Sequence, residues 1–127
     1  MSANAVATKI ARRKLMMARA GDITLSPICG MAFGSGGVDG TGAVIPPSDT
    51  QTALNAEIGR RPIGSHSYSG DTSCVYRVTL SEQDFAGERV SEVGLYDADG
   101  DLVCVKNFLA KGKDEDVEMT FSLEDVL

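Results

Sequence analysis

Residues 91–108 read SEVGLYDADGDLVCVKNF, and the acidic turn in the middle of this stretch decides how the second half of the chain folds. Alternating apolar and polar residues stand on both sides of the turn, which is the pattern of half-buried strands. Asp99 and Gly100 form an Asp-Gly pair, a strong hairpin signal because both residues tolerate a positive φ. The stretch therefore predicts two antiparallel strands joined by a tight turn.

The same turn has a second interpretation, a calcium loop that uses the carboxylates of Asp97, Asp99 and Asp101. An EF-hand loop needs oxygen ligands at its first, third and fifth positions, a glycine at the sixth and a bidentate Glu at the twelfth. Here Gly100 falls at the fourth position and Phe108 at the twelfth. The spacing excludes an EF-hand and favours the hairpin, while weak calcium binding by the three aspartates stays open as the alternative.

Period-two patterns continue on both sides of the hairpin. Residues 72–80 and 116–124 alternate strongly, and residues 60–70 form a weaker strand. Short turns between consecutive strands predict an antiparallel meander of about four to five strands over residues 60–127. The apolar faces consist of Cys74, Tyr76, Val78 and Leu80 in the first strand, and of Val117, Met119, Phe121 and Leu123 in the last.

The first half of the chain has a different character. Residues 3–20 are rich in Ala and lack Gly and Pro, which predicts a helix that Ser2 or Asn4 caps and that Gly21 ends. An extended segment follows at 23–33, then a loop at 34–49 that holds five glycines, then a short helix or turn at 50–58. We expect an α+β fold in a single domain, 1–127: a basic helix (1–21), a strand, glycine- and proline-rich loop and short helix (22–59), and an antiparallel sheet (60–127).

Charge is distributed unevenly along the chain. Residues 1–21 carry five basic residues and no acid, a charge of +5, whereas the remainder carries 7 basic and 18 acidic residues, a charge of −11. The acidic body argues against wrapping by nucleic acid, because phosphates would be repelled. The basic segment itself is suited to nucleic acid, a membrane or an acidic protein surface, and it could also dock on its own acidic body. No apolar run reaches the roughly 18 residues of a membrane span.

The sequence shows no arrangement typical of an enzyme. The histidine, His66, is flanked by Ser65 and Ser67, whose side chains point to the opposite face of a strand. The loop GSGGVDGTG lacks the Lys-Ser or Lys-Thr of a phosphate-binding loop. We therefore predict no catalytic residue, no cofactor and no small-molecule substrate.

Two segments resemble phage tail-collar fibre proteins and related prophage tail proteins. In residues 49–65 the resemblance rests on Thr52, Leu54, Glu57, Arg60 or Arg61, and Ile63. In residues 85–108 it rests on a strand, an Asp-Gly hairpin and an asparagine–aromatic ending: Val90, Glu92, Val93, Gly94, Leu95, Tyr96, Asp99, Gly100, Asn107 and Phe108.

The resemblance implies a structural subunit of a phage tail, a prophage tail or a tail-like contractile particle. It implies protein–protein contacts that join a fibre or adaptor to the baseplate, a homo-oligomer, and a location in the virion tail after synthesis in the bacterial cytoplasm. For the integrity of the fold we expect Gly94, Leu95, Tyr96, Asp99 and Gly100 to matter most. For contacts with partners we expect Arg12, Arg13, Arg60 and Arg61.

Overall fold

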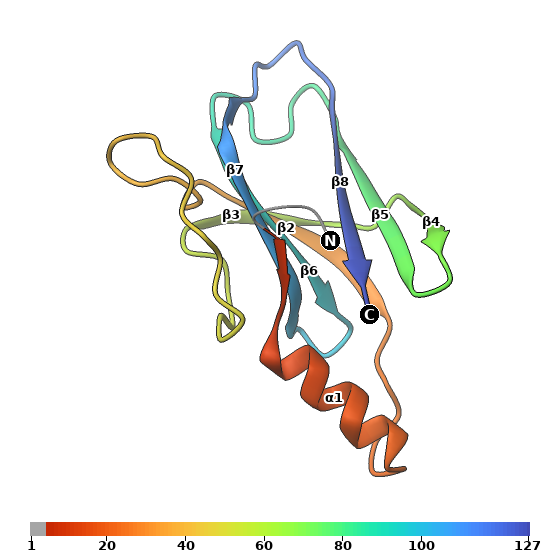
Figure 1. Cartoon of the computed structure of the whole chain (residues 1–127). Helices are drawn as coiled ribbons and strands as arrows, with labels where there is room; N and C mark the ends of the chain where they lie inside the picture. The colour runs from red at the N-terminus through yellow and green to blue at the C-terminus, as the bar shows by residue number, and fades with distance from the viewer. Residues whose placement is uncertain (1–4) are drawn as a thin grey trace.

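The structure is a computed structural model, and it describes residues 5–127. In this part of the chain, eight strands and one helix form (Figure 1). They are β1 (Ala5–Ala7), α1 (Lys9–Arg19), β2 (Ile28–Gly34), β3 (Glu57–Pro62), β4 (Ser65–Gly70), β5 (Ser73–Leu80), β6 (Arg89–Asp97), β7 (Leu102–Gly112) and β8 (Met119–Val126).

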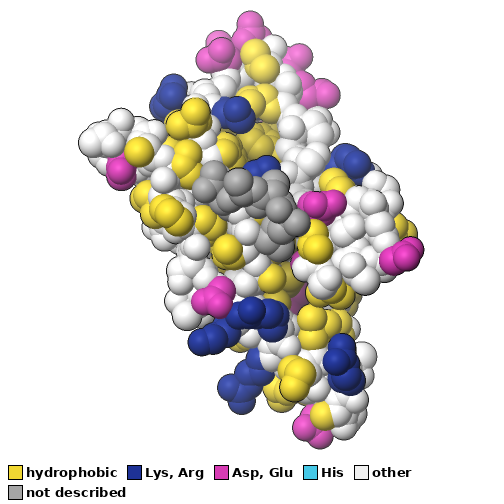
Figure 2. All heavy atoms as spheres, viewed as in Figure 1, with side chains coloured by type: hydrophobic (Ala, Val, Ile, Leu, Met, Phe, Trp, Pro, Cys, Tyr) yellow, Lys and Arg dark blue, Asp and Glu magenta, His cyan; other side chains and the backbone are white. Residues whose placement is uncertain are grey.

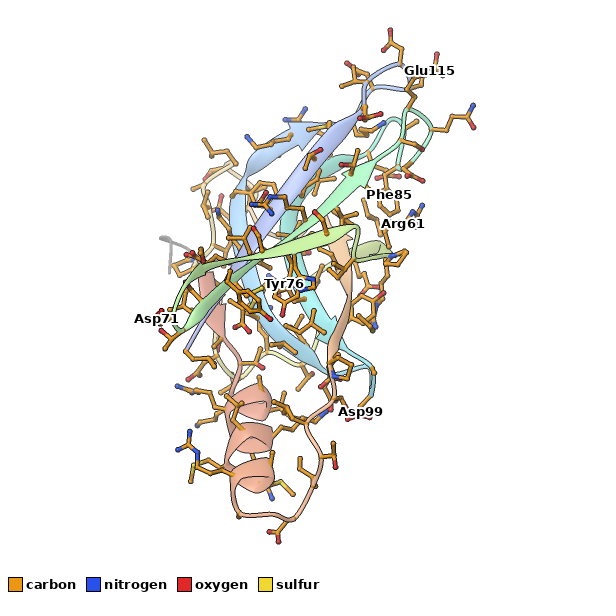
Figure 3. All side chains as sticks on the ribbon, turned by 90° about the vertical axis from the view of Figure 1, so that its right-hand side faces the viewer. Arg61, Asp71, Tyr76, Phe85, Asp99 and Glu115 are labelled. Carbon is orange, nitrogen blue, oxygen red and sulfur yellow. The ribbon has the colours of Figure 1, made fainter. Side chains whose placement is uncertain are left out.

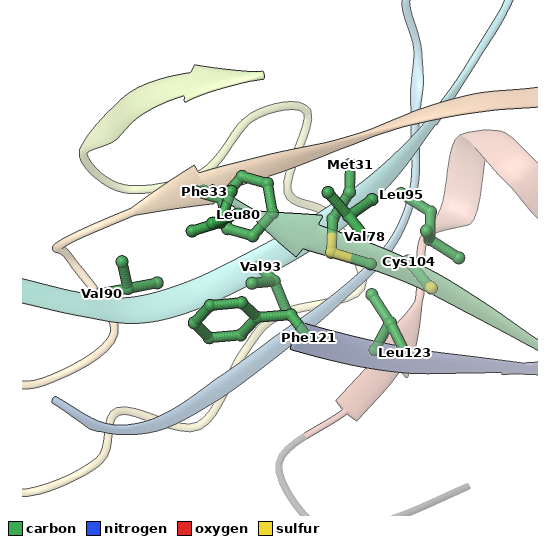
Figure 4. Close-up of a cluster of buried hydrophobic side chains, with 10 residues drawn as sticks. All are labelled: Met31, Phe33, Val78, Leu80, Val90, Val93, Leu95, Cys104, Phe121 and Leu123. Carbon is green, nitrogen blue, oxygen red and sulfur yellow. The ribbon is translucent and has the colours of Figure 1, made fainter. Parts of the chain in front are cut away.

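The strands form two antiparallel sheets that pack face to face as a β-sandwich (Figure 1). One sheet has five strands in the order β1-β7-β6-β2-β3, and the other has three in the order β4-β5-β8. The inner faces of both sheets supply the core in Figure 4, in which Phe33 and Phe121 meet edge to face at 5.3 Å. The core consists of Met31, Phe33, Val78, Leu80, Val90, Val93, Leu95, Cys104, Phe121 and Leu123.

The prediction of an α+β fold with one antiparallel meander is wrong, because the chain changes sheets three times. The first change is the corner between β3 and β4, where Ile63 donates its backbone N–H to the carbonyl of Cys29, and Gly64 donates to that of Arg77. Two further changes run through residues 81–88 and 113–118. Alternation along a strand specifies which face is buried, but it does not specify which sheet the strand joins.

Individual strands agree better with their predictions. The hairpin of β6 and β7 is confirmed, and so is the buried face of β5, on which Val78 and Leu80 are core residues. Residues 60–70 form two strands in different sheets instead of one weak strand. Val117 lies before β8 and is exposed, so it is not part of the apolar face that the sequence predicts.

A second apolar cluster covers the outer face of the five-stranded sheet. It consists of Ala32, Leu54, Leu102 and Val105, with Val6 and Tyr96 packed against it. Leu54 comes from residues 50–56, which form bends and turns and not the short helix that was one of the two predicted possibilities. This segment has to follow the edge of the sheet, and side chains of the sheet hold its backbone there.

The helix is shorter than residues 3–20. Ala5–Ala7 pair with Lys106, Val105 and Cys104 of β7, and α1 begins only after Thr8. Thr8 is fully buried, accepts a hydrogen bond from the backbone N–H of Ala11 and donates its hydroxyl to the carbonyl of Leu102. Thr8 is therefore the N-cap, whereas Ser2 and Asn4 lie outside the described residues. The helix projects from one end of the sandwich and buries none of its residues (Figure 1).

Candidate functional site at the acidic turn

The turn between β6 and β7 is organised by Asp97. One oxygen of its carboxylate accepts hydrogen bonds from the backbone N–H groups of Asp99 and Asp101, both at 3.0 Å. Gly100 donates its own N–H to the Asp97 carbonyl at 2.9 Å and has a φ of 89°, which favours glycine. The predicted hairpin is present, but of the Asp-Gly pair only Gly100 has a positive φ, whereas Asp99 does not.

The ammonium group of Lys14 lies among the three carboxylates of this turn. Its Nζ is 2.7 Å from Asp97 and 2.9 Å from Asp99, and it also pairs with Asp101. The Lys14 side chain is 14% exposed and that of Asp97 is 3% exposed, so the contact is largely shielded from water. Figure 3 shows Asp99 next to α1. Because Lys14 is on α1, this cluster fixes the helix to the hairpin 83 residues further along the chain.

The contacts in this cluster stabilise the charged forms of Lys14 and Asp99. Burial alone would lower the pKa of Lys14, but its hydrogen bonds to Asp101, Asp97 and Asp99 outweigh that effect and raise the pKa above the usual value. The hydroxyl of Ser26 and the ammonium of Lys14 hold the pKa of Asp99 below its usual range. The three aspartates lie close enough together to hold a cation. A cation of the protein itself occupies that position.

The basic segment partly docks on its own acidic body, which was one of the predicted possibilities. In addition to Lys14, Arg12 forms an ion pair with Asp49 at 2.8 Å. Lys9, Arg13, Met16 and Arg19 are exposed on the helix. Figure 2 shows basic side chains gathered around the projecting end of the molecule and acidic ones at the opposite end.

Glu92 is fully buried on β6, a position for which the sequence predicts no special role. Its carboxylate accepts three hydrogen bonds of 2.8 Å, from the backbone N–H groups of Gly36, Asn55 and Ala56. A Cβ atom at Gly36 would lie 2.8 Å from the same carboxylate. Glu92 therefore holds both ends of the long connection between β2 and β3, residues 35–56, against the sheet. Its place in the resembling motif was the available signal, since a Glu in an apolar strand needs hydrogen-bond partners.

The other predicted structural residues line both faces of β6. Leu95 lies in the core between the sheets, and a Cβ at Gly94 would lie 2.5 Å from Leu102 on the outer face. Tyr96 lies across Gly30 of β2, where a Cβ would be 2.1 Å from the phenol oxygen. The guanidinium of Arg60 covers the Tyr96 ring at 4.5 Å. These contacts need small residues directly opposite large ones.

The two arginines of β3 stack on opposite faces of the sheet. Arg60 also forms an ion pair with Glu57 at 2.9 Å. Arg61 covers the ring of Phe85 at 4.3 Å and pairs with Asp84 at 3.1 Å (Figure 3). Both arginines therefore have partners within the chain. Their predicted role in contacts with other proteins stays a prediction.

A groove of 220 Å³ separates α1 from the nearby end of the sandwich. Its lining is mostly apolar and includes Leu15, Ile28, Val103 and the half-buried Asp125. Burial raises the pKa of the Asp125 carboxyl.

No helix within residues 5–127 is long and apolar enough to cross a membrane.

Comparison with known proteins gives one result for nearly the whole chain. A family model described as "Phage tail-collar fibre protein, N-terminal" matches residues 1–122. No match is found among curated proteins. The match covers α1, the strands β1 to β7 and the acidic turn, and it ends within β8.

Proposed function

The chain belongs to the phage tail-collar fibre protein family, which gives it a structural role in a phage tail, and from this role we propose that it joins a fibre or an adaptor to the baseplate. It does so through contacts with other tail proteins. It works as a homo-oligomer and is made in the cytoplasm of the bacterial host before the tail assembles.

One observation supports this proposal more than any other: ion pairs tie α1 to the sandwich although the helix buries none of its residues. An isolated helix of 11 residues is marginal in water. Here Lys14 is bound by three carboxylates, and Arg12 is bound by Asp49. The helix is therefore a fixed arm, and a fixed arm loses little conformational entropy when it binds.

The exposed side of this arm has the chemistry of a protein contact. Arg13 and Arg19 are exposed on it together with Met16, whose side chain is 67% exposed. Methionine adapts to irregular apolar surfaces, and clustered cations are complementary to an acidic one. We assign this side of α1 to an acidic surface on a neighbouring tail protein. Arg12, Arg60 and Arg61 remain candidate contacts alongside their ion pairs within the chain.

The proposal is tested by capturing the tagged full chain from its host during phage production and identifying the co-purifying proteins by mass spectrometry. We expect tail and baseplate proteins with the wild type. We expect far fewer with Arg13→Glu/Arg19→Glu, which reverses the charge of the arm. Arg89→Glu is the matched control on the sandwich and should capture as the wild type does. Capture of the chain without any tail protein would overturn the proposal.

The calcium-binding alternative has weaker support. Lys14 already neutralises part of the charge of Asp97, Asp99 and Asp101, and calcium would have to displace its ammonium. We therefore do not propose it as a second function.

A further inference from the structure

The two sheets of the sandwich differ in width, and each extends past the other on one side. The inner face of β4 carries His66 and Tyr68, since these residues pair directly with Tyr76 and Cys74 of β5. Both are exposed, and Tyr68 is 81% exposed. The five-stranded sheet therefore does not cover β4, which lies at the outer edge of the molecule in Figure 1.

On the opposite side of the sandwich the larger sheet extends past the smaller one. An open groove of 480 Å³ runs between β7 and β8. Phe108 and Phe121 form its apolar floor, with their rings 5.9 Å apart. Lys106 and Lys111 line the β7 side. The inner face of β7 is thus uncovered beyond β8.

The edge of β8 that faces this groove is suited to strand addition. All eight of its residues pair with β5 in one unbroken register, it contains no Pro, Lys or Arg, and its two charged residues, Glu124 and Asp125, stand near its C-terminal end. By contrast, the edge strand β3 ends in Pro62, carries two arginines and is irregular in register. Proteins usually protect long, regular edges with such features. Within residues 5–127, nothing pairs with the outer edge of β8.

We propose that β4 of a second copy of this chain adds to the edge of β8 and fills the groove. The inner face of the added strand would place His66 and Tyr68 of the second copy over Phe108 and Phe121. The two surfaces are complementary in charge. The hairpin at 65–73 carries one formal charge, the carboxylate of Asp71, and the groove carries the ammonium groups of two lysines. An aromatic ring over a lysine adds a favourable cation–π contact.

Such a contact joins two different surfaces, so it is heterologous. A heterologous contact generates a ring when the rotation between copies closes. Main-chain hydrogen bonds would supply affinity, and the side chains in the groove would supply specificity. The inference names the two surfaces that join copies in the homo-oligomer of the proposed function. It rests on that function only for the biological role of the contact.

A charge-swap experiment with the purified full chain tests the contact by sedimentation. We expect the wild type to form oligomers. Tyr68→Lys should be monomeric, because the new ammonium group would face Lys106 and Lys111 of the next copy. Lys106→Asp/Lys111→Asp should also be monomeric, because the new carboxylates would repel Asp71 of the next copy. Mixing the two variants should restore oligomers, since each altered surface then meets a complementary one. Leu109→Lys, at an exposed position on β7, is the control and should behave as the wild type does.

Two results would overturn the inference. One is a wild-type chain that stays monomeric up to about 1 mM, the range of the weakest specific contacts. The other is a Tyr68→Lys variant that sediments as the wild type does. A monomeric wild type would also remove the homo-oligomer from the proposed function. The joining of tail parts is tested by the capture experiment and can fail separately from this inference.

Discussion

The ammonium of Lys14 lies 2.7 Å from the carboxylate of Asp97, a residue 83 positions further along the chain. This ion pair connects the helix to the hairpin that carries the motif of the family. Asp97 also organises the backbone of the turn. One buried carboxylate therefore determines both the shape of the turn and the position of the helix.

Replacing Lys14 with Met should destabilise the protein by roughly 1–3 kcal/mol, because it leaves the buried Asp97 carboxylate without its cation. The loss is limited, since Asp97 keeps its two backbone donors. Urea unfolding measures it. Arg19→Met on the same helix is the control, and its effect should stay within about 0.5 kcal/mol. Equal stability of Lys14→Met and the wild type would contradict the role of the cluster.

The pH dependence of the same variant follows from the pKa directions. The raised pKa of Lys14 makes its contribution complete below the unfolded value, about 10.4, and removes it only in strong alkali. The lowered pKa of Asp99 makes its contribution complete above about 3.9 and removes it in stronger acid. The difference between Lys14→Met and the wild type should therefore be constant between about pH 5 and 9 and shrink below pH 4.

Calcium should not change the thermal stability of the wild-type chain. A specific ligand stabilises the folded state in proportion to RT ln(1 + [L]/Kd), and here the ammonium of Lys14 occupies the carboxylates. Differential scanning fluorimetry with calcium and with a chelator checks this expectation. A rise in Tm that saturates at millimolar calcium would favour the calcium-binding alternative.

Glu92→Gln should cost about 2–4 kcal/mol, because an amide replaces one of two carboxylate oxygens that accept backbone hydrogen bonds. The amide N–H₂ would face backbone donors and leave them unpaired. Both ends of the loop at 35–56, around Gly36 and Asn55, should then exchange their amide hydrogens faster, which hydrogen-exchange mass spectrometry measures. Glu118→Gln, at an exposed position, is the control and should leave both stability and exchange unchanged.

Asp125→Asn should stabilise the protein at neutral pH. Burial raises the pKa of this carboxyl, so the folded state binds its proton more tightly than the unfolded state does. The penalty for the charged form is present above the raised pKa and disappears as the pH falls through it. The gain in Tm should accordingly be present at pH 7 and absent near pH 3. Asp116→Asn, at an exposed position, should show no gain at either pH.

The sequence predicted local features well and their assembly poorly. The Asp99-Gly100 turn and the buried face of β5 follow from short-range rules that the structure obeys. The arrangement of the strands in two sheets does not follow from such rules, because the corner at Ile63 and Gly64 does not change the alternation of apolar residues. Residues 60–70 therefore read as one weak strand, although they form parts of two strands that belong to different sheets.

The site was predictable only in part, for a similar reason. The sequence identified the three aspartates of the turn, but not Lys14, because no local pattern indicates which of five basic residues reaches a turn 83 residues away. The start of the helix was placed too early because Ala5 and Ala7 have high helix propensity. In the structure these residues are held as a strand by β7, so tertiary contacts override propensity.

The most direct test of the account is the position of the chain in an assembled particle. A gold-labelled tag inserted in the exposed connector at residues 114–117 would be located by electron microscopy of purified tails. The account predicts label where the fibres or adaptors meet the baseplate. Tails that are complete in fibres and baseplate but carry no label, from cells that produce the tagged chain as their only copy, would contradict it.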